Sequence, residues 1–200
     1  MRTLWIVLGV VGIIVVYFLF KIPGTYNKAV GLQENVKAKW SNVEATYQRR
    51  ADLIPNLVST VKGYAAHEEQ VLTAVTEARA KATSTTIQAG DLNAESLAKF
   101  QQAQAGLSSA LSRLLVTVEK YPDLKANQNF LELQAQLEGT ENRIAVARER
   151  FNEEVKVYNT YLRKFPNNIF IGWASSDGEF EVMTPFEAEP TSAKAPEVKF

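Results

Sequence analysis

The chain contains no cysteine and a single histidine, His67, among its 200 residues. The absence of cysteine excludes disulfides, thiolate metal sites and a cysteine nucleophile, and it leaves the redox compartment open. One histidine cannot supply the paired ligands of most zinc sites or of di-iron helical bundles. We therefore expect no catalytic, cofactor-binding or metal-binding residues.

Net charge is absent as well. The 22 basic and 22 acidic side chains cancel, so no long-range field gathers a polyanion around the protein. Nucleic acid is therefore not an expected partner. The length suits one domain plus an appendage.

Charged residues are also missing from a long stretch near the amino terminus. The run "LWIVLGVVGIIVVYFLF", Leu4 to Phe20, would extend about 26 Å as a helix, which nearly spans a bilayer core. A cleaved signal peptide is the alternative. The run is longer than a usual signal core, and "KIPGTYNKAVG" after it offers no A-x-A cleavage site. We predict a retained transmembrane anchor over residues 1–22.

The basic residues flanking this run bear on its orientation. Four lysines follow it closely, whereas only Arg2 precedes it. The positive-inside rule therefore favours a cytoplasmic position for the rest of the chain, although long domains can cross a membrane regardless of charge. The lysines are Lys21, Lys28, Lys37 and Lys39.

The middle of the chain predicts an all-α fold. Pro23-Gly24 should end the membrane helix, and Thr25 should cap a new helix whose apolar residues recur at steps of three and four as far as Val75. Residues 82–93 form the clearest loop, with Asp91 or Asn93 as the cap of a second helix. Pro122 closes that helix, and a third begins near Asp123 and continues to about Pro166.

Short connections between long amphipathic helices favour antiparallel packing. We therefore predict an elongated, antiparallel up-and-down bundle of three long helices over residues 25–166. The lower half of the first helix, or the tail, would supply a fourth element.

Residues 167–200 have a different character. The apolar patch from Ile169 to Trp173 is compatible with a strand of a small hairpin, an amphipathic stub on the membrane, or a lid over the end of the bundle. Asp177-Gly178 is a turn signal. The last dozen residues, rich in Pro, Ala and Glu, are typical of disorder.

Several charged and amide side chains lie beside the apolar seams. With Leu137 at heptad position a, Glu141 and Arg148 fall at e and Arg143 at g, next to the seam and within reach of neighbouring helices. We predict a polar network that joins the first and third helices and fixes their register. Solvated surface charges are the alternative. The candidate residues are Arg49, Arg50, Asp52, Glu141, Asn142, Arg143 and Arg148.

Two residues within the predicted helices suggest a shaped contact. Pro55 removes one helical hydrogen bond and pushes against the carbonyl of Ala51, so we expect a kink there. Gly139 costs about 1 kcal/mol in a helix interior, which a close approach of a neighbouring backbone would explain.

No catalytic motif is complete. In "AHEEQ" a zinc-protease helix would need a second histidine four residues after His67, where Val71 stands. The serines of "GLSSALS" have no histidine base at a predictable distance.

Three blocks of the sequence resemble the bacterial LemA family. They are "YQRRADLIPNLVSTVKGYAAHE", "YPDLKANQNFLELQAQLEGTENRIAVARERFNEEVKVYN" and "FPNNI", and the resemblance runs from the anchor to about Phe170. It implies a single-pass membrane protein with a helical bundle, no established enzymatic activity and organising or adaptor duties at a membrane.

The sequence therefore leads to a functional hypothesis: a non-enzymatic scaffold or adaptor in the bacterial inner membrane. Self-association and contacts with other membrane proteins are expected. The alternative is a membrane-tethered sensor that binds a small ligand between bundle helices, which would need a pocket with convergent polar groups.

Overall fold

The computed structural model describes residues 2–88 and 91–187, and this part of the chain is helical without any β-strand. The predicted all-α class is confirmed. The helices are α1 (Arg2–Lys62), α2 (Glu69–Ser84), α3 (Ala94–Val118), α4 (Pro122–Lys125), α5 (Gln128–Arg163) and α6 (Asn167–Ala174).

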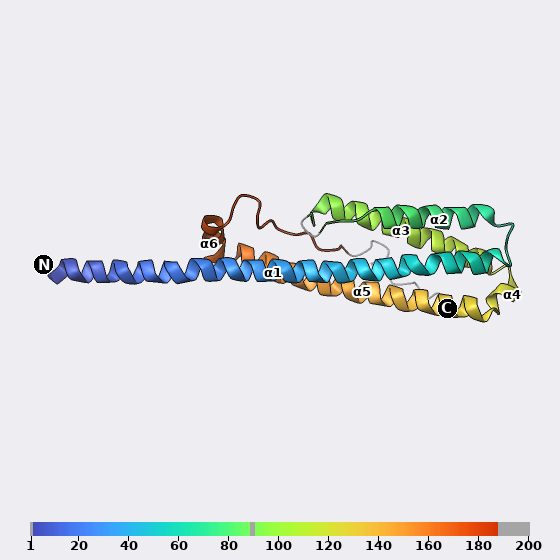
Figure 1. Cartoon of the computed structure of the whole chain (residues 1–200), viewed down its shortest axis with the longest axis horizontal. Coiled ribbons are helices and arrows are strands. Elements are labelled where there is room, and N and C mark those ends of the chain that lie inside the picture. The colour runs from blue at the N-terminus through green and yellow to red at the C-terminus, as the bar shows by residue number, and fades with distance from the viewer. Residues whose placement is uncertain (1, 89–90, 188–200) are drawn as a thin grey trace, which may run out of the picture.

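The helices form an elongated rod built around α1. Figure 1 shows α1 running almost the whole length of the molecule, with α5 antiparallel beside it. The helices α2 and α3 cover only the half of the rod that lies farther from the amino terminus, which we call the distal half. The other half of the bundle, the proximal half, is completed by α6 and by residues 175–187, a turn followed by an extended stretch, which we call the strap.

Each half has its own apolar core. The distal core is mostly aliphatic and includes Ile54, Leu57, Leu107 and Leu114. The proximal core is rich in aromatic residues and gathers side chains from six parts of the chain: α1, the loop between α2 and α3, α3, α5, α6 and the strap. Its largest members are Trp40, Tyr47, Phe100, Phe151, Tyr158 and Phe186.

The expectation that Pro23-Gly24 ends the membrane helix is wrong. The helix α1 continues through both Pro23 and Pro55. A proline removes only one helical hydrogen bond, and the residues just after Pro23 are held by packing, with Thr25 and Ala29 buried. Thr25 does not cap a new helix, because its hydroxyl donates to the carbonyl of Lys21 (2.9 Å) inside α1.

The expected helix through Val75 is interrupted. α1 ends at Lys62, and a turn over residues 63–68 reverses the chain into α2. The spacing of apolar residues does not indicate this turn, because Leu72 and Val75, which follow it, are buried in the same distal core as the end of α1. The fourth bundle element is therefore α2.

Most other boundaries follow the predicted signals. Asn93 caps α3 by accepting a hydrogen bond from the Ser96 N–H (3.0 Å). After Pro122 the chain first makes the short α4, so the third long helix, α5, begins at Gln128 rather than near Asp123, capped by Asn127.

The apolar patch after Pro166 forms α6, which packs on α1 and α5 near the level where the anchor meets the bundle. It is not a hairpin strand. The Asp177-Gly178 turn is confirmed: Gly178 has a φ of 81°, and the Glu179 N–H donates to the Ser176 carbonyl (3.1 Å). The predicted disorder of the last dozen residues lies outside the described part of the chain.

Candidate functional site

The most prominent polar feature of the bundle is the buried guanidinium of Arg50 on α1, whose side chain is 2% exposed. Its Nη1 donates to Glu141 Oε1 on α5 (2.8 Å) and to Ser108 Oγ on α3 (3.0 Å). Its Nη2 donates to Gln104 Oε1 on α3 (2.6 Å). One side chain therefore joins three helices.

The network also reaches α2. Gln104 Nε2 donates to the backbone carbonyl of Ala82 (3.3 Å). Arg79, on α2, donates from Nε to the carbonyl of Ala51 (2.8 Å), which is the carbonyl left without a helical donor because Pro55 has no N–H. The proline in α1 thereby creates an acceptor that fixes α2 against it.

This network separates the two cores. Along α1 the proximal core ends at Tyr47 and the distal core begins at Ile54, with Arg50 between them. Gln104 occupies the equivalent level of α3, and buried Thr140 that of α5. A polar layer inside an apolar stack disfavours sliding of one helix along another, because a shift would bury unpaired polar groups.

A carboxylate and an aromatic ring contact the Arg50 guanidinium. Glu141 supplies a carboxylate whose side chain is 50% exposed, so the pair is desolvated mainly on the arginine side. The centroid of the Tyr47 ring lies 5.1 Å from the guanidinium carbon of Arg50, close enough for a cation–π contact.

The remaining predicted network residues lie elsewhere. Arg49, Asp52, Asn142 and Arg143 are exposed, and Asp52 accepts a hydrogen bond from Gln48 (2.7 Å) within α1. Arg148 instead turns to the strap: its Nη2 donates to the Glu187 carbonyl (3.0 Å), and its guanidinium lies 4.7 Å from the Phe186 ring centroid.

The expected close approach at Gly139 is wrong. A Cβ built on this glycine meets nothing within 4 Å, and the residue lies on an exposed face of α5. The neighbouring helices approach the opposite side of α5, where Leu137 and Thr140 are buried. At Pro55 the helix stays continuous, and the consequence that we observe is the freed Ala51 carbonyl.

A second polar feature was not predicted. Asn152 and Asn159, two turns apart on α5, each clamp one residue of the strap with a pair of hydrogen bonds. Asn159 accepts from the Met183 N–H (3.0 Å) and donates to the Met183 carbonyl (2.8 Å). Asn152 does the same with Phe186 (2.8 and 3.0 Å). Seven-residue spacing of asparagines on one helix face was the sequence signal available for this feature.

The two strap residues held by these hydrogen bonds, Met183 and Phe186, have their side chains buried in the proximal core. The Phe186 ring stacks on Trp40 with centroids 5.9 Å apart and planes 23° apart, and it meets Phe151 edge-on at 5.5 Å. At the other end of the strap, Tyr26 donates its hydroxyl hydrogen to the Glu179 carboxylate. This bond raises the pKa of Tyr26 and lowers that of Glu179.

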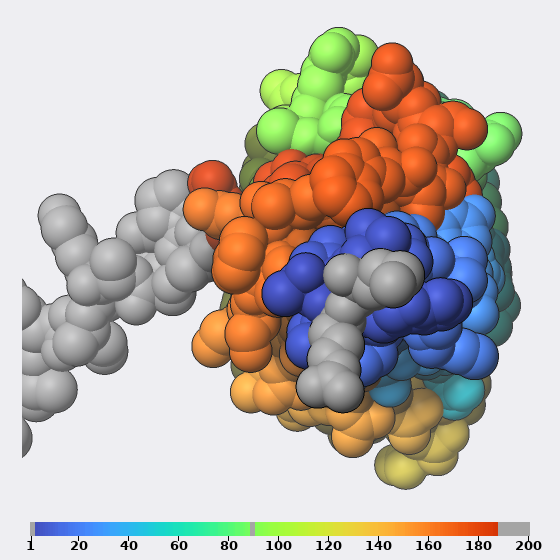
Figure 2. Space-filling model, turned by 90° about the vertical axis from the view of Figure 1, so that its left-hand side faces the viewer, coloured from blue at the N-terminus to red at the C-terminus, as the bar shows by residue number. Residues whose placement is uncertain are grey.

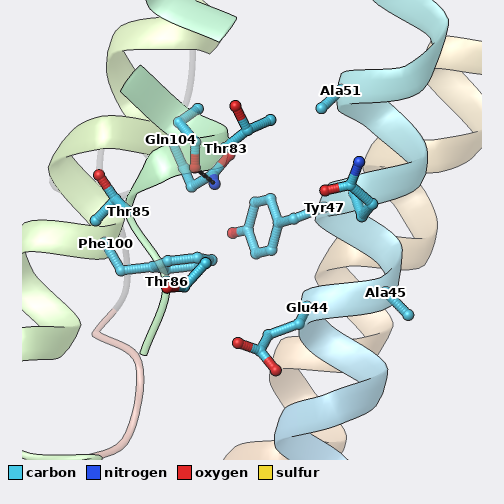
Figure 3. Close-up of a pocket in the computed structure, with 11 residues that line it drawn as sticks. Glu44, Ala45, Tyr47, Ala51, Thr83, Thr85, Thr86, Phe100 and Gln104 are labelled. Carbon is cyan, nitrogen blue, oxygen red and sulfur yellow. Dashed lines mark hydrogen bonds between the residues drawn. The ribbon is translucent and has the colours of Figure 1, made fainter. Parts of the chain in front are cut away.

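A small cavity borders the Arg50 layer. It has a volume of about 200 Å³. Figure 3 shows Tyr47 projecting from α1 between Gln104 and Phe100, with Glu44 one turn away at the edge of the cavity. Burial raises the pKa of Glu44. Among the described residues, no group of three or more His, Cys, Asp or Glu side chains is placed to hold a metal ion.

A sequence model of the LemA family matches residues 39–200, which is most of the chain. The protein belongs to the LemA family. The match includes the strap and everything after it, so the expectation that the resemblance ends near Phe170 is wrong. It begins within α1, after the apolar run.

The curated proteins to which this chain is similar are named MamQ or LemA. Magnetosome protein MamQ 2 of Paramagnetospirillum magneticum is 29% identical over 172 residues, covering 77% of this chain and 63% of that protein. Magnetosome protein MamQ of Magnetospirillum gryphiswaldense is 29% identical over 169 residues, with 76% and 62% covered. Protein LemA of Metamycoplasma hominis is 22% identical over 158 residues, with 79% and 65% covered. The chain therefore spans less than two thirds of the length of these relatives.

Proposed function

We propose that this LemA-family protein is a single-pass protein of the bacterial inner membrane whose helical rod serves as a non-enzymatic scaffold. The supporting observation is the first part of α1, which is long and apolar enough to cross a membrane and has none of its most apolar window buried inside the protein. Apolar surface of this extent needs lipid or a partner to cover it. The anchor comprises residues 1–22, the bundle 25–166 and the carboxyl-terminal part 167–200.

The continuity of α1 supports a scaffold. Since α1 passes from the apolar run into the bundle without a break, the anchor and the bundle share one rigid axis. The 61 residues of α1 correspond to a length of about 90 Å at the helical rise, of which roughly 60 Å lies beyond the anchor. A rod of this kind holds partners at a fixed height above the lipid.

A groove between α1 and α5 is our candidate surface for partners or for a second copy. Its lining includes the side chains of Lys39, Arg143 and Arg150 and no acidic residue. Such a surface attracts acidic groups on another protein. Relatives named as magnetosome proteins support a role in organising a cellular structure. The lysines after the anchor favour a cytoplasmic bundle.

The anchor can be tested separately from the scaffold. The full chain should remain in the membrane pellet after alkaline carbonate extraction, and removal of residues 1–22 should release it. Protease added to intact spheroplasts should spare a cytoplasmic bundle. Release of the full chain by carbonate would contradict the anchor.

The scaffold is tested at the groove. Arg143→Ala should reduce cross-linked assemblies and co-purified proteins without changing membrane insertion. Arg49→Ala, a loss of the same charge at an exposed position outside the groove lining, is the matched control. Equal assembly profiles for both variants would contradict a docking role for the groove.

The alternative, a small-ligand sensor, is favoured by one observation, the cavity beside Gln104 and Tyr47. Its volume of about 200 Å³ admits only a small polar molecule or a few waters. A thermal-shift screen of metabolites and ions should then yield a ligand whose effect disappears in Gln104→Leu. A screen without any hit would count against the sensor.

A further inference from the structure

The short helix α6 lies against α1 at the end of the apolar run. The Phe170 ring meets Phe18 of α1 edge-on, with centroids 5.8 Å apart, and the Trp173 ring lies 6.3 Å from the same phenylalanine. Phe170 is buried, and Ile171 is buried as part of the proximal core. The position of α6 along the anchor is therefore fixed by aromatic packing.

Much of the apolar surface of α6 and its surroundings is uncovered. Trp173, despite its contact with Phe18, is 67% exposed, and Ile169 is 39% exposed. Phe165, just after α5, is 74% exposed, and Phe20 on α1 is 79% exposed. Figure 2 looks along the molecule from its amino-terminal end and shows the orange segment that contains α6 around the blue α1, which projects toward the viewer. These side chains lie on the segments that meet near the end of the apolar run, where α6 contacts α1 and α5.

Exposed cations accompany these side chains. Lys21 directly follows the apolar run, and Arg163 and Lys164 end α5 at the same end of the bundle. Long basic side chains beside apolar surface are well suited to reach lipid phosphates while their stems stay in contact with the apolar layer.

The depth of α6 follows from that of the anchor. If Leu4 to Phe20 fill the hydrocarbon layer, then Phe18 lies two residues, or about 3 Å of helical rise, from its edge. The rings that touch Phe18 must lie near the same depth. That level, between acyl chains and headgroups, is where tryptophan is most favoured in membrane proteins.

We infer that α6, with Phe165 and Phe20, forms a collar that inserts into the headgroup region of the leaflet next to the bundle. The occupant of this apolar surface is the lipid that surrounds the anchor, because the surface is continuous with the apolar run. The collar adds a second point of contact with the bilayer, through α5 and α6, and limits tilting of the rod. This inference rests on the proposed anchor.

Three glycines allow the collar to be tested without disturbing any side chain. A Cβ at Gly12, Gly139 or Gly172 meets nothing within 4 Å, and the chain has no cysteine of its own. Each can therefore be changed to cysteine and spin-labelled in the full-length protein. Gly12 reports on the anchor, Gly172 on α6, and Gly139 on the distal bundle as the aqueous control.

The labelled proteins are reconstituted in vesicles of phosphatidylethanolamine with phosphatidylglycerol, and the accessibility of each label to oxygen and to a water-soluble nickel complex is measured. We expect Gly12→Cys to be accessible to oxygen and shielded from nickel, Gly139→Cys to be the reverse, and Gly172→Cys to give an intermediate ratio. When Trp173→Glu and Ile169→Glu are added, the oxygen-to-nickel accessibility ratio of the Gly172 label should fall to that of the Gly139 label in water. The ratio of the Gly12 label should not change.

Two results would overturn the collar. The first is a Gly172 label with the same oxygen-to-nickel accessibility ratio as the Gly139 label in water, while the Gly12 label remains embedded in lipid. This result would leave the proposed anchor intact. The other is spin–spin broadening at Gly172 that persists on dilution with lipid, which would mean that a second copy covers α6. An aqueous ratio at Gly12 itself would instead contradict the proposed function.

Discussion

The two halves of the bundle bury the same two helices, α1 and α5, against different partners. In the distal half, the partners are the helices α2 and α3, whose backbone groups are hydrogen-bonded mainly within each helix. In the proximal half, the partners include the extended part of the strap, whose N–H and C=O groups need external partners. Asn152 and Asn159 supply them at Met183 and Phe186. A helix can thus be replaced by an extended segment when the facing helix carries amides at the right register.

Arg50 lies where the two halves meet, and its removal should have the largest effect. Arg50→Ala removes the hydrogen-bond donor to Gln104 and Ser108. It also creates a void between the two cores. We expect a loss of about 3–5 kcal/mol in the free energy of unfolding, measured by denaturant in detergent micelles. The neighbouring Arg49→Ala, at an exposed position, should stay within about 0.5 kcal/mol of the parent. Equal losses would show that the layer does not couple the halves.

The proximal half can be opened on its own. Asn152→Ala or Asn159→Ala removes both hydrogen bonds to one strap residue, at an expected cost of about 1–3 kcal/mol. Hydrogen exchange at the Met183 and Phe186 amides should accelerate while amides of the distal core keep their protection. Asn142→Ala, an exposed asparagine on the same helix, is the control. Unchanged exchange at both strap amides would contradict the clamps.

A smaller effect is expected at the proline in the distal half. Arg79→Ala should cost about 1–2 kcal/mol, because it leaves the Ala51 carbonyl without a donor. Pro55→Ala restores a helical N–H to that carbonyl, so Arg79→Ala should cost much less in that background. A double-mutant cycle on unfolding free energies measures the difference. A coupling energy near zero would mean that Arg79 acts only through its surface charge.

The two halves also differ in how much of their structure can be predicted from the sequence. The three- and four-residue spacing of apolar side chains predicts the helices, and the charges beside Ala51 and Leu137 predict a polar network between the first and third long helices, within which Arg50 and Glu141 are the pair that meets. Gln104 was visible as a polar residue within the seam of α3. The course of the strap was not predictable, because an extended segment bound by side-chain amides has no periodicity of its own, and the spacing of Asn152 and Asn159 does not say which segment they bind. Nor was the turn after Lys62, since burial continues across it with the same spacing.

The proximal half has one further property that the distal half lacks, a buried tyrosine. Burial raises the pKa of the Tyr158 hydroxyl from 10.0 to about 12, and Glu181 on the strap adds to the shift. A group whose pKa is higher in the folded protein stabilises the fold below its unfolded pKa and loses that contribution as pH rises. The parent should therefore lose stability relative to Tyr158→Phe between pH 10 and pH 12. Parallel stability curves for the two proteins over this range would mean that Tyr158 ionises as freely in the folded state as in the unfolded chain, and that the strap does not keep water from the proximal core.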